Sequence, residues 1–340
     1  MKPPVAVAFS GGKDSSAAVL FLREAGHSVR ALHLRLGLAA EDGHIQRVVR
    51  LAETLAVPLE IIDARVPFKK TVIEYFLAAY RSGRTPNPCA VCNRHFKFGF
   101  LLRQLKGEAG ELLATGHYAA QVEITGQRFL REPRQKTKSQ IYFLSLIDPA
   151  VLERVLFPLA DRTLADVRRR VARLPLANPE ESQDACFLQG QSLAEYLGER
   201  LPASFRPGDF LSGDGQIIGR HQGALHYTVG QRRGTRFSSS TRLYVLGVDV
   251  AANTVTLGSD RKLYADSLRV RQVNFWRPLR PGDHLKVKIR SQHRGEMAAI
   301  TAVSESGIEA DFAKPVRALT PGQVAVFYDD DIIVAAGEIA

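Results

Sequence analysis

The stretch AFSGGKDSS, residues 8–16, decides the fold of the first half of this chain. It follows a short apolar run and opens a helical pattern, which makes it the turn of a strand–turn–helix unit. Gly11 and Gly12 have no Cβ, so the backbone can approach a ligand closely, and the helix N-terminus supplies free N–H groups and the positive end of its dipole. With three serine hydroxyls beside them, these features predict a phosphate-binding loop.

Two better known phosphate motifs do not describe this loop. The residue five positions before Gly12 is Val7 rather than glycine, which excludes a Walker A loop, and the glycines do not follow the GxGxxG fingerprint of dinucleotide-binding folds. A glycine-rich turn that is merely capped by Ser10 or Asp14 is the structural alternative.

Alternating strand and helix patterns surround the loop and predict a parallel α/β sheet with crossover helices. Gly116 and His117 follow the last apolar run, at the carboxyl end where open sheets of this kind bind ligands. We therefore expect a ligand site at that edge. The expected strands cover residues 5–9, 29–34, 59–62 and 111–115, and the expected helices cover 15–24, 45–55 and 72–80.

The second half of the chain has a different pattern. From about residue 201, frequent Gly, Pro and Asp turns separate short alternating runs, which is typical of small β-domains. We predict an α/β domain with a parallel sheet over 1–200, a small central β-domain over 201–260 and a C-terminal β-barrel over 261–340.

Composition is that of an ordinary globular protein with a basic surplus. The 340 residues include 46 Lys and Arg against 35 Asp and Glu, a net charge of +11, which predicts a polyanionic partner. Three cysteines do not make a disulfide scaffold, so a reducing, cytoplasmic location is expected. We find no signal peptide or membrane span in the sequence and expect no membrane attachment.

The loop RTPNPCAVCNRHFKFG, residues 84–99, carries Cys89 and Cys92 at Cys-x-x-Cys spacing. That spacing indicates metal, cluster or redox chemistry. A closed structural zinc site needs four ligands, and only Cys186 remains unless His95 takes part. Three thiolates with one open position suit an iron–sulfur cluster or a sulfur-transfer pair, while two incidental buried cysteines are the structural alternative.

Family-specific motifs extend these observations over nearly the whole chain. SGGKDSS resembles the signature of the PP-loop, or N-type, ATP pyrophosphatases, which adenylate a substrate oxygen and release pyrophosphate. Six further motifs together resemble the tRNA-specific 2-thiouridylases, which install sulfur at C2 of the wobble uridine of tRNA. They are RTPNPCAVCNRHFKFG (84–99), ATGHYA (114–119), SQIYFLS (139–145), ESQDACFL (181–188), HYTVGQRRG (226–234) and TPGQVAVFY (320–328).

This resemblance implies an ATP-dependent sulfurtransferase that uses Mg²⁺ and binds the anticodon arm of tRNA. We expect the chain to be a monomer. The phosphate loop would grip the pyrophosphate end of ATP, with Asp14 near Mg²⁺. The residues implied for ATP are Ala8, Phe9, Ser10, Gly11, Gly12, Lys13, Asp14, Ser15, Ser16, Leu34 and Gly116. Those implied for tRNA are Asn87, Pro88 and Cys89 around the flipped target base, and His117, Lys138, Ser139, Gln140, Arg290, Ser291 and Gln323 elsewhere.

The resemblance also implies how sulfur moves. In the persulfide version, the uridine O2 attacks the α-phosphate of ATP, Cys186 delivers sulfur as a persulfide, and Cys92 assists its release. The sulfur comes from a donor protein or from sulfide. Both cysteines act as thiolates, so a cationic neighbourhood such as Arg94, Lys97 or Arg84 would help them.

Cys89 departs from the family pattern, since many members have Asp at this position. With Cys89, Cys92 and Cys186 all present, three ligands could hold a [4Fe-4S] cluster whose fourth iron binds the transferred sulfide. We favour this cluster version slightly over the persulfide version, because the third cysteine otherwise has no function.

Three other positions also differ from the family. Lys13 stands where an apolar residue is common and would add a cation near ATP. Ser139 and Ile141 replace Asp and Ser of the usual Lys-Asp-Gln-Ser run, which predicts a weaker RNA contact.

Two other functions stay open: a PP-loop enzyme that modifies another base or a small acid, and a non-catalytic RNA-binding iron–sulfur protein, against which the intact SGGKDSS argues.

Overall fold

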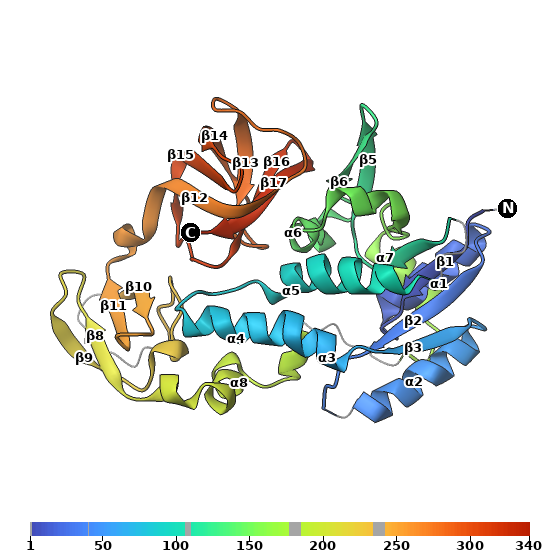
Figure 1. Cartoon of the computed structure of the whole chain (residues 1–340), viewed down its shortest axis with the longest axis horizontal. Helices are drawn as coiled ribbons and strands as arrows, with labels where there is room; N and C mark the ends of the chain where they lie inside the picture. The colour runs from blue at the N-terminus through green and yellow to red at the C-terminus, as the bar shows by residue number, and fades with distance from the viewer. Residues whose placement is uncertain (1, 40, 106–109, 177–184, 234–241) are drawn as a thin grey trace. The chain divides into compact units, whose positions relative to one another are not determined.

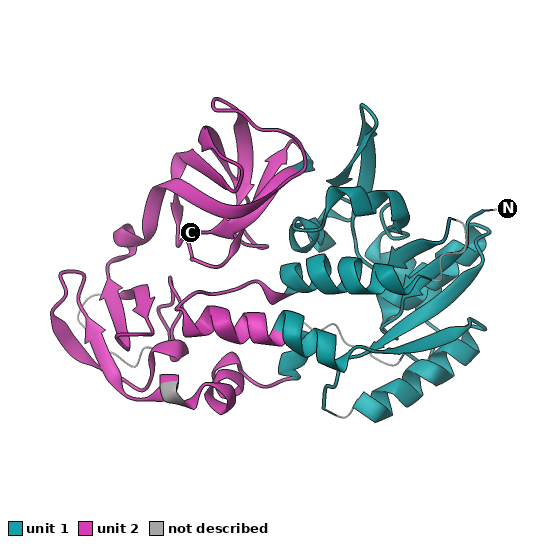
Figure 2. Ribbon diagram, in the orientation of Figure 1, with its two compact units in different colours: residues 1–72, 89–189, 331–333 teal, residues 73–88, 190–330, 334–340 magenta. Residues whose placement is uncertain are grey.

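A computed structural model describes residues 2–39, 41–105, 110–176, 185–233 and 242–340. They form two compact units: unit 1 comprises 1–72, 89–189 and 331–333, and unit 2 comprises 73–88, 190–330 and 334–340 (Figure 2). The first four residues of the ESQDACFL motif lie outside the described residues, as does the end of the HYTVGQRRG motif. The three-domain division of the sequence stays a prediction.

Unit 1 is built on a parallel five-stranded sheet in the order β3-β2-β1-β4-β7. Figure 1 labels β1, β2 and β3 of this sheet. Ala8 pairs with Leu32 on one side and with Thr115 on the other, so the carboxyl ends of the three central strands meet at one edge. The expected parallel α/β fold is confirmed. The strands are β1 (Val5–Ala8), β2 (Val29–Arg35), β3 (Leu59–Asp63), β4 (Leu112–Thr115) and β7 (Val155–Leu156).

Two helices cover one face of this sheet because their apolar stripes meet the same strand side chains. Val19 of α1 and Leu51 of α2 share a core cluster with Val5 of β1. Helix α7 packs beside α1, and a capping box between Thr163 and Asp166 fixes where it begins. The α-helices of unit 1 outside the cysteine segment are α1 (Lys13–Glu24), α2 (Glu41–Thr54), α3 (Arg65–Phe68), α6 (Ile141–Leu144) and α7 (Leu164–Val171).

The cysteine segment is a run of short helical pieces. Cys89 lies in α5 (Pro88–Val91), and Cys92 opens the π-helix η2 (Cys92–Phe100), which leads into the 3₁₀ helix η3 (Leu101–Gln104). π-Helices are rare in proteins overall, and those that occur are often found at functional sites. The remaining elements are η1 (Lys69–Ile73), the hairpin β5 (Ala120–Ile124) and β6 (Gln127–Arg131), and the 3₁₀ helices η4 (Lys136–Lys138), η5 (Pro149–Arg154) and η6 (Cys186–Leu188).

Unit 2 contains a small sheet in the order β10-β11-β8-β9. Its core gathers Phe210, Tyr227, Val245 and Val255. This sheet confirms the expected central β-structure. The elements are α4 (Glu74–Arg81), α8 (Leu193–Arg200), η7 (Pro202–Phe205), β8 (Gly208–Leu211), β9 (Ile217–His221), η8 (Ala224–His226), β10 (Tyr244–Asp249), β11 (Thr254–Gly258) and η9 (Asp260–Leu263).

The C-terminal strands run in the order β12-β15-β14-β13-β16-β17, and β12 pairs again with β17 to close a six-stranded barrel. Trp276, which is 1% exposed, is among the largest fully buried side chains. The expected C-terminal barrel is confirmed. Its strands are β12 (Tyr264–Phe275), β13 (His284–Lys288), β14 (Glu296–Val303), β15 (Gly307–Arg317), β16 (Val324–Asp329) and β17 (Ile332–Ile339). Among the described residues, we find no helix with the length and hydropathy needed to cross a membrane.

Candidate functional site

The predicted phosphate loop joins β1 to α1 at the carboxyl edge of the sheet. Gly11 has φ +77°, a conformation that favours glycine, and Gly12 is the N-cap of α1 in an extended conformation. The hydroxyls of Ser15 and Ser16 both donate to the Gly12 carbonyl oxygen, at 3.0 and 2.9 Å, and the Ser10 hydroxyl lies 3.2 Å from that of Ser15. These bonds hold the loop in an open turn over the helix N-terminus.

The N-terminus of α1 is suited to an anion. Within the described chain, no side chain caps this helix, so its first-turn N–H groups and its positive dipole end face the loop. The end of β4 comes close behind it: a Cβ on Gly116 would lie 2.7 Å from the Asp14 carbonyl carbon and 2.8 Å from the Ser15 nitrogen. Only glycine allows this approach, and the resulting cradle fits the phosphates of a nucleotide.

Asp14 lies beside this cradle in a polar contact with a buried tyrosine. The Tyr118 hydroxyl donates to Asp14 Oδ1 at 3.3 Å. Burial raises the pKa of the Asp14 carboxyl, while the neighbouring Lys13 ammonium and the Tyr118 hydrogen bond lower it. A carboxylate at the edge of a phosphate cradle is a ligand type that Mg²⁺ prefers.

Two histidines that the sequence analysis did not single out also support the loop. The His33 ring on β2 donates from Nδ1 to the Phe9 carbonyl oxygen at 2.8 Å, and the His44 ring on α2 hydrogen bonds to the backbone of Ser10. The two rings lie 5.5 Å apart. Burial lowers the pKa of both imidazoles, so they support the loop in their neutral form.

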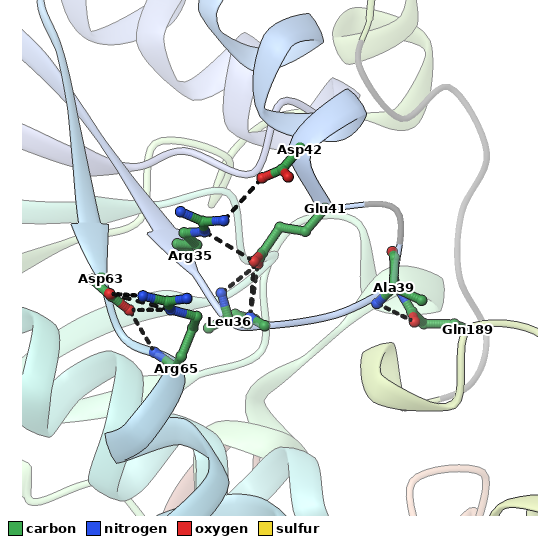
Figure 3. A network of polar contacts seen from close by, with 9 residues as sticks. Arg35, Leu36, Ala39, Glu41, Asp42, Asp63, Arg65 and Gln189 are labelled. Carbon is green, nitrogen blue, oxygen red and sulfur yellow. Dashed lines mark hydrogen bonds and ion pairs between the residues drawn. The ribbon is translucent and has the colours of Figure 1, made fainter.

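Leu34, implied for the adenine, is half-buried near the carboxyl end of β2, next to the strand that carries the phosphate loop. The chain that follows it is held by polar contacts (Figure 3). Oε1 of Glu41 accepts hydrogen bonds from the backbone N–H groups of Leu36 and Gly37, and Arg35 pairs with the same carboxylate at 3.4 Å. Leu34 and the phosphate loop therefore lie on neighbouring strands of unit 1.

The three cysteines lie in one region of unit 1 although Cys186 is far from the other two in sequence. All are free thiols. Cys89 and Cys186 are exposed to solvent, and desolvation by the neighbouring protein atoms raises the pKa of both thiols. Burial raises the pKa of Cys92 to about 12, and the charges of Cys186 and Cys89 add to that rise.

Lys97 is the cation that acts on this group. Its ammonium lowers the pKa of all three thiols, which confirms one of the three expected cationic neighbours. Its effect is smaller than that of burial, so the pKa of all three thiols still lies above the usual value. Arg84, another expected neighbour, instead pairs with Glu338 at 2.7 Å.

The cysteines do not form a ready metal site. Among the residues that the structure describes, no three or more His, Cys, Asp or Glu side chains are grouped so that they could hold a metal ion. A [4Fe-4S] cluster spreads its thiolates over several irons, so ligands grouped for a single ion do not test it, and the three-cysteine cluster stays a prediction.

The other residues of unit 1 that were implied for tRNA gather around the end of β4. The His117 ring shares a 2.8 Å hydrogen bond with the Thr115 hydroxyl, and burial holds its pKa well below the usual range, so it is neutral. Gln140 is tied to the segment after β4 by two hydrogen bonds: its backbone N–H donates to the Tyr118 carbonyl oxygen, and the Tyr118 N–H donates to its Oε1, both at 2.9 Å. Lys138 ends η4, and the neighbouring Ser139 hydroxyl is buried with no hydrogen-bond partner among the described residues.

The remaining implied tRNA residues belong to unit 2. Asn87 is 8% exposed and precedes Pro88 at the end of the 73–88 segment. The Gln323 amide donates to the carbonyl oxygens of Thr85 and Pro86, at 3.2 and 3.4 Å, so it fixes that segment. Arg290 and Ser291 lie between β13 and β14, where the Arg290 guanidinium is exposed.

Comparison with known families divides the chain into three matched regions. A model described as "tRNA methyl transferase HUP domain" matches residues 3–190, "tRNA methyl transferase PRC-barrel domain" matches 194–259, and "Aminomethyltransferase beta-barrel domain" matches 265–339.

Similar proteins match over their full length. The chain is 38% identical to the tRNA-specific 2-thiouridylase MnmA of Aquifex aeolicus, over 98% of each chain. It is 38% identical to tRNA-specific 2-thiouridylase MnmA 1 of Syntrophus aciditrophicus, over 100% of this chain and 93% of the relative. It is 37% identical to the tRNA-specific 2-thiouridylase MnmA of Syntrophotalea carbinolica, over 99% of this chain and 98% of the relative.

Proposed function

The chain belongs to the family of tRNA-specific 2-thiouridylases, and from this premise we propose that it converts the wobble uridine of tRNA to 2-thiouridine at the expense of ATP. The observation that carries the proposal is that one compact unit holds both an uncapped phosphate cradle and a group of three free cysteines around Lys97. The first supports adenylation and the second supports sulfur transfer.

ATP is a substrate in this proposal. The 10–12 turn and the first turn of α1 bind its phosphates, and Leu34 and Gly116 flank its adenine at the carboxyl edge of β2 and β4. Asp14 would hold Mg²⁺, which when bound would offset the charge of the phosphates. The uridine O2 attacks the α-phosphorus, pyrophosphate leaves, and C2 of the uridine carries AMP as a leaving group.

Sulfur then replaces AMP. The terminal sulfur of a Cys186 persulfide attacks C2, the C–O bond to AMP breaks, and the thiolate of Cys92 attacks Sγ of Cys186. The sulfur–sulfur bond of the persulfide supplies the electron pair of the new thiocarbonyl sulfur, and the two cysteines end as a disulfide. A dithiol reductant restores both thiols, and a sulfur-donor protein reloads Cys186. The three-cysteine cluster is the alternative route to the same product.

The substrate explains the charge of the chain. Lys138, His117, Arg290 and Gln323 stay proposed tRNA contacts, and the net charge of +11 supports association with a polyanion. Free thiols require a reducing compartment, which supports a cytoplasmic location.

The test is formation of 2-thiouridine in unmodified tRNA with ATP and a persulfide donor. We expect pyrophosphate release to require tRNA, and release without RNA would overturn the proposal. Cys186→Ser and Cys92→Ser should abolish thiolation while Cys89→Ser retains most of it. Loss of activity in all three variants, with about four iron atoms and four sulfides per chain in anaerobically purified protein, would replace the persulfide route by the cluster.

A further inference from the structure

The side chain of Gln189, three residues after Cys186, binds the loop that follows β2. The Gln189 Oε1 accepts a hydrogen bond from the Ala39 N–H at 2.8 Å, and the Gln189 Nε2 donates to the Ala39 carbonyl oxygen at 3.0 Å (Figure 3). These two residues lie 150 positions apart in the sequence. A carboxamide is the side-chain type that offers a donor and an acceptor side by side for one residue's backbone.

We call the two hydrogen bonds between Gln189 and Ala39 the Gln189 clasp. The loop that the clasp holds at Ala39 is also fixed at its start, near Gly37. Glu41 holds the Gly37 N–H at 2.9 Å, and Gly37 has φ +77° and lies against the aliphatic stem of Arg65. The Arg65 guanidinium in turn pairs with Asp63 at the end of β3. Residues 36–39 are therefore suspended between the carboxyl edge of the sheet and Gln189.

The segment on the other side is the turn that carries Cys186. The 3₁₀ helix η6 (Cys186–Leu188) ends at Gln189, which has φ +48° and ψ +39°. This left-handed conformation is uncommon for a residue with a side chain. It stops the helix directly after Cys186 and its two followers, so the clasp and the cysteine share one short turn.

We propose that Gln189 is a positioning residue that couples ATP binding to the placement of Cys186. ATP bound at the carboxyl edge of β1 and β2 orders the 36–39 loop, and the Gln189 clasp transmits that order to the η6 turn. Sulfur is then aimed at C2 only when the nucleotide is bound. The inference rests on the proposed function, since it needs ATP at this edge.

The first experiment compares pyrophosphate release with 2-thiouridine formed, using the full chain, unmodified tRNA, ATP and a persulfide donor. In Gln189→Leu, adenylation continues, but the misplaced Cys186 lets water attack C2 and return uridine and AMP. We expect the yield of 2-thiouridine per pyrophosphate to fall about three- to tenfold. The control is Gln191→Leu, which removes the same residue type from the same segment, where its amide donates to Glu199 at 3.0 Å; its yield should stay at the wild-type value.

A second experiment needs no catalysis. The rate of Cys186 alkylation by iodoacetamide is measured by peptide mapping, with and without a non-hydrolysable ATP analogue. We expect the analogue to slow alkylation at least threefold in the wild-type protein and to have little effect in Gln189→Leu. Direct shielding by the nucleotide would persist in the variant, so equal slowing in both proteins, or a wild-type yield in the variant, overturns the proposal. Failure of the wild-type protein to bind the analogue, or to release pyrophosphate with tRNA, would instead overturn the proposed function.

Discussion

Gly116→Ala tests whether the end of β4 closes the phosphate cradle. The new Cβ would lie 2.7 Å from the Asp14 carbonyl carbon, 2.8 Å from the Ser15 nitrogen and 2.9 Å from the Asp14 oxygen. All three are backbone atoms, so a rotamer change cannot relieve the contact. To reach the ~3.5 Å of ordinary carbon contact, β4 or the start of α1 must move by about 0.8 Å.

Overpacking of this kind costs about 1–3 kcal/mol of unfolding free energy, which leaves a typical domain folded. A misplacement near 1 Å in a site that positions reactants lowers the rate by about 10²-fold. We therefore expect a drop of that order in kcat/KM for ATP, measured as tRNA-dependent pyrophosphate release over an ATP titration. Urea unfolding checks that the variant is folded.

Gly43→Ala is the matched control in the same unit. Gly43 lies inside α2, and a Cβ there would meet only Arg47 Nη1, at 3.7 Å. Alanine in a helix is more stable than glycine by about 0.5–1 kcal/mol, so this variant should gain stability and keep its kcat/KM. If Gly116→Ala retains the wild-type kcat/KM for ATP, the β4 end does not shape the nucleotide site.

Three further predictions concern charge. Burial lowers the pKa of the neutral, 5% exposed His33 below 6.5 in the folded protein, so the unfolded chain takes up this proton first on acidification. The contribution of His33 to the free energy of unfolding is complete above pH 6.5 and falls by up to about 1.4 kcal/mol per pH unit below it. The urea midpoint should therefore be lower at pH 5.5 than at pH 7.5, and equal midpoints at the two pH values would contradict this. Lys97→Met should raise the pKa of the three cysteine thiols further and so slow their alkylation at pH 8. The control Lys70→Met, at an exposed lysine, should leave the alkylation rate unchanged. Equal alkylation rates in the two variants would show that Lys97 does not act on the thiols. Glu338→Gln removes the negative charge that pairs with Arg84 at 2.7 Å and with Arg271 at 2.5 Å, and it should lower the free energy of unfolding in urea by about 1–3 kcal/mol. The control Glu309→Gln, at an exposed ion pair, should lower it by less than ~0.5 kcal/mol. Similar losses in the two variants would count against a special role for the buried Glu338 carboxylate.

The parts of the site that depend on neighbours in sequence were predictable. The SGGKDSS loop could be predicted because two glycines, three serines and the start of a helix are adjacent in the sequence. The structure has the strand, the turn and the helix in that order. Lys97 could be picked out near Cys92 for the same reason. The size of the burial effect on the thiols could not, since it depends on the packing of the whole unit.

Contacts between distant segments left no comparable signal. Nothing around Gln189 points to Ala39, because a single glutamine carries no period or spacing. The resemblance assigned Gln323 to tRNA, while the structure uses its amide to hold the 85–86 backbone. The π-helix at Cys92 was also missed, since no local pattern in 92–100 distinguishes it from an α-helix.

The raised thiol pKa values bear on how such a site survives between turnovers. A thiolate is the form that oxidises and that attacks other sulfurs, and burial keeps Cys92 protonated with a pKa of about 12. The same burial would slow a Cys92 that had to act alone. Lys97, which favours the thiolate at all three cysteines, reduces that barrier without removing it. Loss of the Cys92 proton is therefore expected to be a controlled step of the reaction, one that depends on what approaches the thiol and not on the resting charge around it.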